Sequence, residues 1–147
     1  MSKTNIIIHF VFGTKNRKRV ILSENCRELY KYIYGILTNL ECHIIRINGI
    51  EDHVHILTEI NPSISIADIM KKVKQASSHW LKQNILFPDF NGWGRGYFAV
   101  SVSPEHKEDV RQYIINQEIH HKGIEYVDEL QSMILGHGME WYDDEWT

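Results

Sequence analysis

Residues 48–57 read Asn-Gly-Ile-Glu-Asp-His-Val-His-Ile-Leu, and this stretch predicts how the middle of the chain folds. Asn48-Gly49 and Glu51-Asp52 are pairs typical of tight turns between strands. Strand-like sequence lies on both sides, with residues 42–49 before the turn and the His-x-His run after it. The sequence therefore predicts an antiparallel hairpin whose second strand contains both histidines.

The two histidines of this hairpin are expected to face the same way. On a strand, side chains alternate between the two faces of the sheet, so His53 and His55 share one face. Val54 and Ile56 then point to the opposite face, into a hydrophobic core. Two neutral imidazoles on one face can bind a divalent cation. The chain has nine histidines, however, so the spacing alone is weak evidence for a metal site.

Strands and helices are also predicted on either side of the hairpin, from runs of β-branched and aromatic residues and from apolar residues at helical spacing. They are strands at 5–12 and 97–102, and helices at 24–41, 65–83, 104–121 and 126–135. This order predicts an α+β fold, a ferredoxin-like βαββαβ unit with a four-stranded antiparallel sheet and two helices on one face. A tyrosine-bearing helix and an acidic tail follow the last strand.

The composition fits one soluble domain. The chain has 147 residues, of which 43% are hydrophobic and 24% charged. No apolar run approaches the roughly 20 residues of a membrane helix, so no membrane association is expected. The N-terminus does not have the layout of a signal peptide, and we therefore expect a cytoplasmic location.

Charge is divided unevenly along the chain. All 16 Lys and Arg lie in residues 1–122 beside 12 acids, whereas residues 123–147 contain seven acids and neither Lys nor Arg. We expect a mildly basic domain over 1–122 and an acidic C-terminal tail helix over 123–147, packed on the domain or swapped between copies. One hypothesis is that the tail covers a basic face and competes with nucleic acid. A tail that completes the core or a dimer explains the split equally well.

A second group of candidate functional residues lies in the helix predicted after the last strand. Tyr113 and Gln117 are four residues apart, so they are expected on the same helical face. By itself, a tyrosine at this spacing is more often part of a core or a surface than of an active site.

Taken together and in order, these motifs resemble those of the single-strand HUH transposases. These are the compact insertion-sequence enzymes with one catalytic tyrosine and their REP-associated relatives. The resemblance runs over residues 5–122, and residues 124–147 resemble the tail of the REP-associated members. The matching features are His9, Thr14-Lys15-x-Arg17, Gly49 with His53-Val54-His55, Trp93-x-Arg95-Gly96-Tyr97-Phe98, and Tyr113 to Gln117.

The resemblance implies an enzyme that cuts and rejoins single-stranded or hairpin DNA through a covalent 5′-phosphotyrosine. Tyr113 would be the nucleophile, and His53, His55 and Gln117 would hold Mg²⁺ or Mn²⁺. Family members are homodimers, and whether the tyrosine acts within its own chain stays open. Candidates for contacting the DNA are Lys15, Arg17, Lys74 and Arg95 for its backbone, with Trp93 and Tyr97 as stacking surfaces.

Two other functions fit part of the sequence. A ferredoxin-like domain can bind single-stranded nucleic acid on its sheet without cutting it. Alternatively, His53 and His55 could bind zinc together with His120 or His121, which close the third predicted helix.

Overall fold

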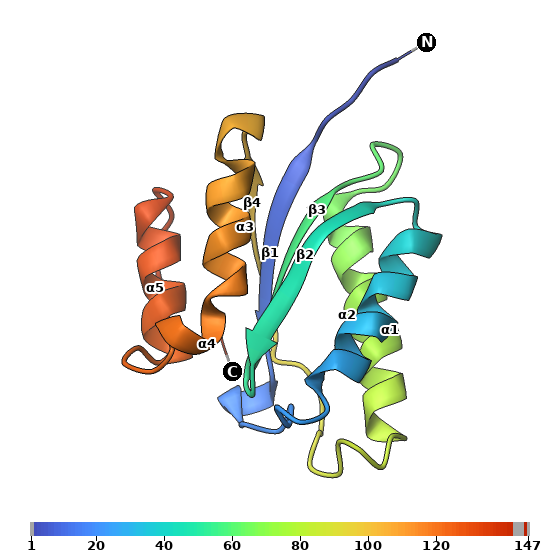
Figure 1. Ribbon diagram of the computed structural model, residues 1–147, viewed down its shortest axis with the longest axis vertical. Coiled ribbons are helices and arrows are strands. Elements are labelled where there is room, and N and C mark those ends of the chain that lie inside the picture. The colour runs from blue at the N-terminus through green and yellow to red at the C-terminus, as the bar shows by residue number, and fades with distance from the viewer. Residues whose placement is uncertain (1, 143–145, 147) are drawn as a thin grey trace.

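The computed structural model describes residues 2–142 and 146 (Figure 1). Asp143, Asp144 and Glu145, which the sequence assigns to the acidic tail, lie outside the described residues. The elements are β1 Ile7–Gly13, η1 Lys15–Arg17, α1 Cys26–Asn39, β2 His43–Ile50, β3 His53–Glu59, α2 Ile66–Lys82, β4 Phe98–Val102, η2 Pro104–His106, α3 Lys107–Ile115, α4 Gln117–His120 and α5 Tyr126–Gly136.

The four strands form one sheet in the order β2-β3-β1-β4, and every neighbouring pair is antiparallel. This confirms the predicted order of strands and helices, because a βαββαβ chain places its first and third strands in the centre. The central strands β1 and β3 are almost entirely buried. They therefore present residues to a packed layer on each side of the sheet.

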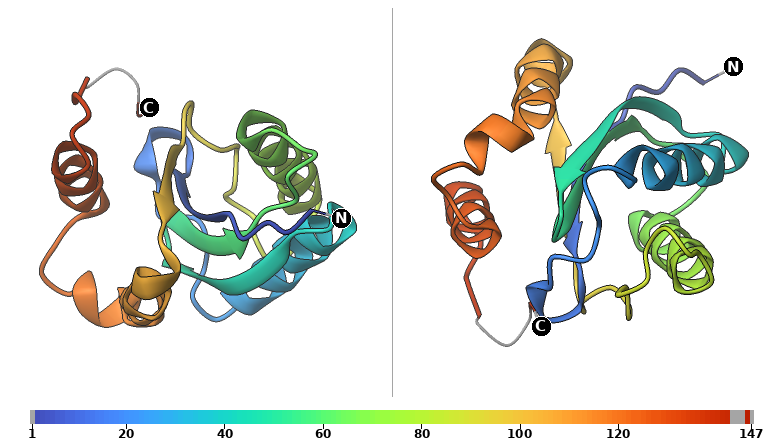
Figure 2. Two further views of the ribbon diagram at one scale, coloured as in Figure 1. Left: turned by 90° about the horizontal axis from the view of Figure 1, so that it is seen from above. Right: turned by 60° about the horizontal axis from the view of Figure 1, so that its bottom comes forward.

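Helices cover both faces of this sheet (Figure 2). On one face, α1 and α2 pack over the main hydrophobic core, to which β1 contributes Phe10 and Phe12 and β3 contributes Val54 and Ile56. The other face is covered by the later part of the chain, α3 to α5 (Figure 1). His53 and His55 lie on this second face, since their neighbours Val54 and Ile56 point into the first core.

The hairpin is present, but its turn is shorter than the sequence predicts. β2 continues through Asn48-Gly49 to Ile50, and only Glu51 and Asp52 form the turn. Gly49 lies opposite Val54 in the ladder, where a Cβ would overlap the carbonyl oxygen of His53. The glycine is therefore needed for close strand approach rather than for a turn.

The continuous helix predicted from residue 104 to about His121 is wrong. The segment is divided into η2, α3 and α4, with Asn116 between the last two at φ −91° and ψ 19°. The break has a hydrogen-bonding partner, because Asn48 Nδ2 donates to the carbonyl oxygens of Ile114 (2.9 Å) and Ile115 (3.2 Å). A side chain from β2 thus satisfies carbonyls at the C-terminus of α3.

The tail helix α5 is integrated into the fold. Tyr126, Leu130 and Ile134 of α5 pack against Val11 of β1 and Phe98 of β4, forming a second, smaller core. Within the part of the chain that the structure describes, no helix has both the length and the apolar character required to cross a membrane.

Candidate active site

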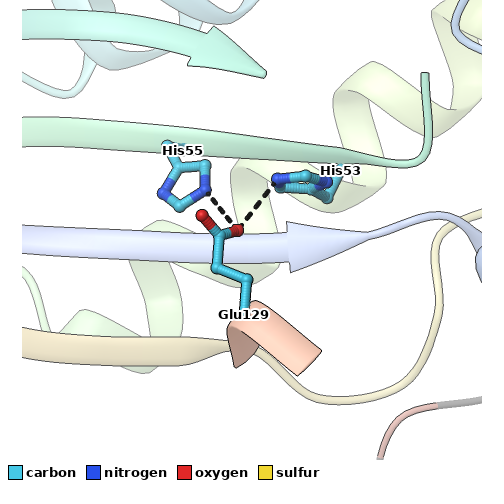
Figure 3. A group of neighbouring side chains, drawn as sticks. All are labelled: His53, His55 and Glu129. Carbon is cyan, nitrogen blue, oxygen red and sulfur yellow. Dashed lines mark hydrogen bonds and ion pairs between the residues drawn. The ribbon is translucent and has the colours of Figure 1, made fainter. Parts of the chain in front are cut away.

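Three buried side chains from two distant parts of the chain meet on the second face of the sheet (Figure 3). His53 and His55 project from β3, and Glu129 reaches toward them from α5. The Nε2 atom of each histidine lies 3.2 Å from the same carboxylate oxygen, Glu129 Oε1. The prediction that the two imidazoles share a face is confirmed.

Each of the two imidazoles has a hydrogen-bond partner at its Nδ1 atom. His53 Nδ1 donates a hydrogen bond to Asp52 Oδ1 at 2.7 Å, and Asp52 is itself buried. His55 Nδ1 shares a 2.8 Å hydrogen bond with His9 Nε2 from β1. This arrangement orients both Nε2 atoms toward Glu129, as partners of metal-binding histidines commonly do.

Gln117 joins the same cluster because the chain turns at Asn116. Its Oε1 atom lies 3.0 Å from His53 Nε2, and its amide nitrogen donates to Glu129 Oε2 at 3.1 Å. The side chain is fully buried. The structure thus brings together His53, His55 and Gln117, the three residues that the family resemblance implies as metal ligands, although Gln117 begins a separate short helix.

The Tyr113 hydroxyl lies on the other side of the Glu129 carboxylate. It donates a hydrogen bond to Glu129 Oε2 and lies 3.3 Å from His120 Nε2. The Tyr113 ring also contacts that of His55, with centroids 5.8 Å apart. One carboxylate thus lies between the phenol and the pair of imidazoles.

The buried charges of the cluster depend on one another. Burial raises the pKa of Glu129, but the adjacent imidazoles of His121, His53 and His55 outweigh it and hold this pKa well below its usual range. Burial lowers the pKa of His55 to about 4. Burial, together with the hydrogen bond to Glu129, raises the pKa of Tyr113 above its ordinary value of 10. The phenol is therefore protonated at neutral pH in this arrangement.

The donor set fits a divalent cation. His53 Nδ1 donates a hydrogen bond to Asp52, and its Nε2 faces two acceptors, the oxygens of Gln117 and Glu129. This contact is favourable only when Nε2 carries a proton or binds a cation that the two oxygens also contact. Two imidazole nitrogens, a carboxylate and an amide oxygen are ligands for Mn²⁺ or Zn²⁺, and the oxygens also for Mg²⁺.

The sequence of this chain matches a family model described as "Transposase IS200 like" over residues 2–117. The match covers β1 to the first residue of α4, and so includes the histidines of β3, Tyr113 and Gln117. The chain belongs to the IS200-like transposase family.

Individual relatives agree with this assignment. The ISDra2 transposase TnpA of Deinococcus radiodurans is 25% identical over 116 residues, which cover 74% of this chain and 81% of that protein. The transposase of insertion sequence IS200 from Salmonella typhimurium is also 25% identical, over 121 residues and 79% of each protein.

Two solved structures share the architecture. A Deinococcus radiodurans protein assigned as a transposase has a TM-score of 0.60 and 27% identity, covering 79% of this chain and 93% of its own. A REP-associated tyrosine transposase bound to a REP hairpin has a TM-score of 0.64 over 100% of this chain and 92% of its own. At 14% identity, the second structure supports the fold alone.

Most predicted DNA contacts of this IS200-like transposase line one groove, of about 930 Å³, formed by α2 and two loops. Lys15, Lys74, Trp93 and Arg95 are among its lining residues. Lys74 has a second role, because its Nζ donates to the carbonyl oxygens of Gly94 (2.8 Å) and Gly96 (3.0 Å).

The stacking residues are less accessible than a stacking surface requires. Trp93 is half-buried, donates its indole N–H to Ser77 Oγ at 2.9 Å, and packs edge-on against Phe12. Tyr97 is also half-buried and lies beside Phe10 rather than in the groove.

Arg17, a candidate for contacting the DNA backbone, also lies outside the groove, and it donates to the carbonyl oxygen of Trp146 at 3.1 Å. Only part of the predicted DNA-contact set therefore shares one surface.

Glu129 is the member of the site that sequence analysis missed. In the sequence it is one of seven acids in the tail, where charge alone suggests a solvated surface. One signal was available: Tyr126, Leu130 and Ile134 follow helical spacing, so Glu129 is placed next to an apolar stripe. An acid beside the buried stripe of an amphipathic helix is a candidate for a buried, paired carboxylate.

Proposed function

We propose that this chain is a DNA transposase that cuts and rejoins single-stranded or hairpin DNA through a covalent 5′-phosphotyrosine at Tyr113. The observation that supports it best is the convergence of Tyr113, Gln117 and the His53–His55 pair around Glu129 in one chain. Membership of the IS200-like family, whose match spans residues 2–117, supports a common role for Tyr113, Gln117 and the two histidines.

In the proposed reaction, the Tyr113 oxygen bonds to the scissile phosphorus while the bond from phosphorus to the 3′-oxygen breaks. The electron pair of that bond goes to the 3′-oxygen, which takes up a proton and leaves as a hydroxyl group. The phenol proton passes to a neighbouring acceptor, for which Glu129 Oε2 and His120 Nε2 are the adjacent groups. The phosphodiester energy is conserved in the tyrosine ester, so the strand can be rejoined without ATP.

His53, His55, Gln117 and Glu129 would hold the divalent ion, Mg²⁺ or Mn²⁺. When bound, the ion would polarise the phosphoryl oxygen and offset negative charge in the transition state. A cavity of about 400 Å³ reaches this region, with Tyr113, His120 and Glu129 in its wall. It provides a route from solvent to the phenol and to the carboxylate beside it.

Partners of the chain are proposed on the same basis. A REP hairpin is bound by the structural neighbour, and we infer that hairpin DNA binds here along the groove containing Lys15 and Arg95. The arrangement of Tyr113 beside its own histidines supports cleavage in cis. A homodimer, expected from the family resemblance, stays a prediction, and a cis site does not require one.

The observations disfavour the binding-module alternative. A domain that stacks bases on its sheet needs an open sheet face with exposed aromatic residues. Here β1 and β3 are buried, with helices over both faces of the described sheet (Figure 2).

The test is a covalent capture experiment. A hairpin oligonucleotide labelled at its 3′ end is incubated with protein and Mn²⁺, and the products are separated on a denaturing gel. Wild type and the control Tyr34→Phe, whose tyrosine is exposed on α1, should form a labelled protein adduct. Tyr113→Phe should bind the DNA but form none. Adduct formation by Tyr113→Phe would refute the assignment, and binding without any adduct in wild type would favour the binding module.

A further inference from the structure

A second cluster of possible metal ligands adjoins the site described above. His120 Nε2 lies 3.3 Å from Glu129 Oε2, and His121 Nε2 lies 3.0 Å from Glu129 Oε1. The ligand atoms of these three residues all lie within 4.8 Å of one another. Glu129 is the member common to this cluster and to the His53–His55 cluster.

In the second cluster, His121 has a buried ring nitrogen that faces the Glu129 carboxylate. Its Nδ1 donates to the carbonyl oxygen of Ile124 at 2.6 Å, because a carbonyl can only accept. In the neutral imidazole the lone pair is then on Nε2, which has no hydrogen-bond partner among the described residues and is 3.0 Å from a carboxylate oxygen. The His121 side chain is only 3% exposed, so bulk water does not screen Nε2 from the carboxylate oxygen. A cation between them would convert this repulsion into coordination.

His120 supplies a ligand that solvent can reach. Its side chain is 29% exposed, and it lines the same 400 Å³ cavity as Tyr113 and Glu129. An ion can therefore enter beside His120 without passing the buried histidines of β3. Its partially exposed position also leaves room for water to complete the coordination shell.

The fold holds these ligands together over a short stretch of chain. His120 ends α4 and His121 follows it, and their rings are perpendicular with centroids 5.2 Å apart. The chain then reverses through residues 122–125 into α5, which presents Glu129 to both rings. Because Tyr126 and Leu130 anchor α5 on the sheet, the position of Glu129 is fixed independently of the two histidines.

We propose that His120, His121 and Glu129 bind a second divalent transition-metal ion, so that the Glu129 carboxylate bridges two ions. The two imidazole nitrogens favour Mn²⁺ or Zn²⁺ over Mg²⁺ or Ca²⁺, which prefer shells of oxygen. Carboxylates that bridge two ions hold them about 3.5–4 Å apart. This binding requires no DNA, and it therefore stands or falls separately from the proposed strand transfer.

Metal stoichiometry tests the proposal. Full-length protein, stripped with a chelator, is titrated with Mn²⁺ and separately with Zn²⁺ in a calorimeter. We expect two ions per wild-type chain, one in His120→Ala/His121→Ala, and one in His53→Ala/His55→Ala. The matched control His43→Ala/His106→Ala removes two exposed histidines outside both clusters and should retain two ions. One ion in wild type, or two in the His120/His121 variant, would overturn the proposal.

Electron paramagnetic resonance tests the shared carboxylate. Two Mn²⁺ ions bridged by Glu129 should give an exchange-coupled spectrum in wild type, and a single-ion spectrum in either of the two cluster variants. If His120→Ala/His121→Ala does not fold by circular dichroism, the single variant His120→Gln provides the same test, since this side chain is partly exposed. An uncoupled spectrum from wild type loaded with two ions would exclude the bridge.

Discussion

Replacement of Gly49 by alanine should disturb the fold and the metal site together. Gly49 is buried in β2 opposite Val54, and a Cβ there would overlap the carbonyl oxygen of His53 and lie 3.0 Å from Val54 Cα. Both neighbours are backbone atoms of the strand that presents the two histidines. They cannot move aside without shifting β3 itself.

The expected cost follows from this overlap. Overpacking in a buried region typically destabilises a protein by about 1–3 kcal/mol. Alanine also restricts the unfolded chain, which returns about 0.4–1 kcal/mol. The net loss in the free energy of unfolding should therefore lie between about 0 and 2.6 kcal/mol, with a central value of about 1.3 kcal/mol. Because the displaced carbonyl belongs to His53, affinity for Mn²⁺ should also fall, on the order of tenfold.

Gly35 provides the matched control. It is solvent-exposed in the middle of α1, and a Cβ there would lie within 4 Å of no described atom beyond the neighbouring backbone of its own helix. Gly35→Ala should therefore stabilise the protein, by about 0.5–1 kcal/mol, and leave Mn²⁺ binding unchanged. Urea unfolding measures the first quantity and calorimetry the second. Equal stability of the two alanine variants would refute the close-approach argument for Gly49.

Further predictions concern charge. Lys15→Ala should weaken DNA binding and reduce the slope of log affinity against log salt concentration by about one unit. Lys74→Ala should have the same effect on DNA binding and should also lower the thermal stability, because Lys74 donates to two loop carbonyls. Burial lowers the pKa of His55 from 6.5 to about 4. Between these two pH values His55 is protonated in the unfolded chain but neutral in the folded chain, so acidification favours unfolding. Acidification over that window should cost the metal-free protein about 3 kcal/mol, and His55→Asn should flatten the dependence in urea titrations. Deleting residues 139–147 removes the carbonyl that Arg17 contacts but keeps α5, and tighter DNA binding at low salt would support the tail-competition hypothesis.

Local sequence was sufficient for most of the fold. Period-two alternation placed His53 and His55 on one face, and helical spacing located α1, α2 and α5 to within about two residues. The break at Asn116 was not predictable in this way. No glycine or proline marks it, and its partner is Asn48, which is distant in sequence and looked like a turn residue.

The composition of the site was predictable only where residues share an element or a family motif. His53, His55, Tyr113 and Gln117 were found on that basis. Glu129 belongs to neither class, because its place depends on how α5 docks on β1 and β4. Tertiary packing decides which of the tail acids is buried, and charge counts cannot distinguish them.

Because Glu129 is a proposed ligand on α5, metal binding and docking of this helix should be linked. An ion that binds only the docked arrangement stabilises it by about 2.7 kcal/mol at a hundredfold excess over its dissociation constant. Amide exchange of α5, measured by mass spectrometry, should therefore slow on the order of a hundredfold when Mn²⁺ is added, provided that α5 opens without global unfolding. α1 packs on the opposite face of the sheet and should not respond (Figure 1). In Glu129→Gln the effect on α5 should be lost. Unchanged exchange of α5 in Mn²⁺-loaded wild type would mean that Glu129 does not contribute to the binding energy of the ion, and that the buried carboxylate serves only to pair with the surrounding histidines.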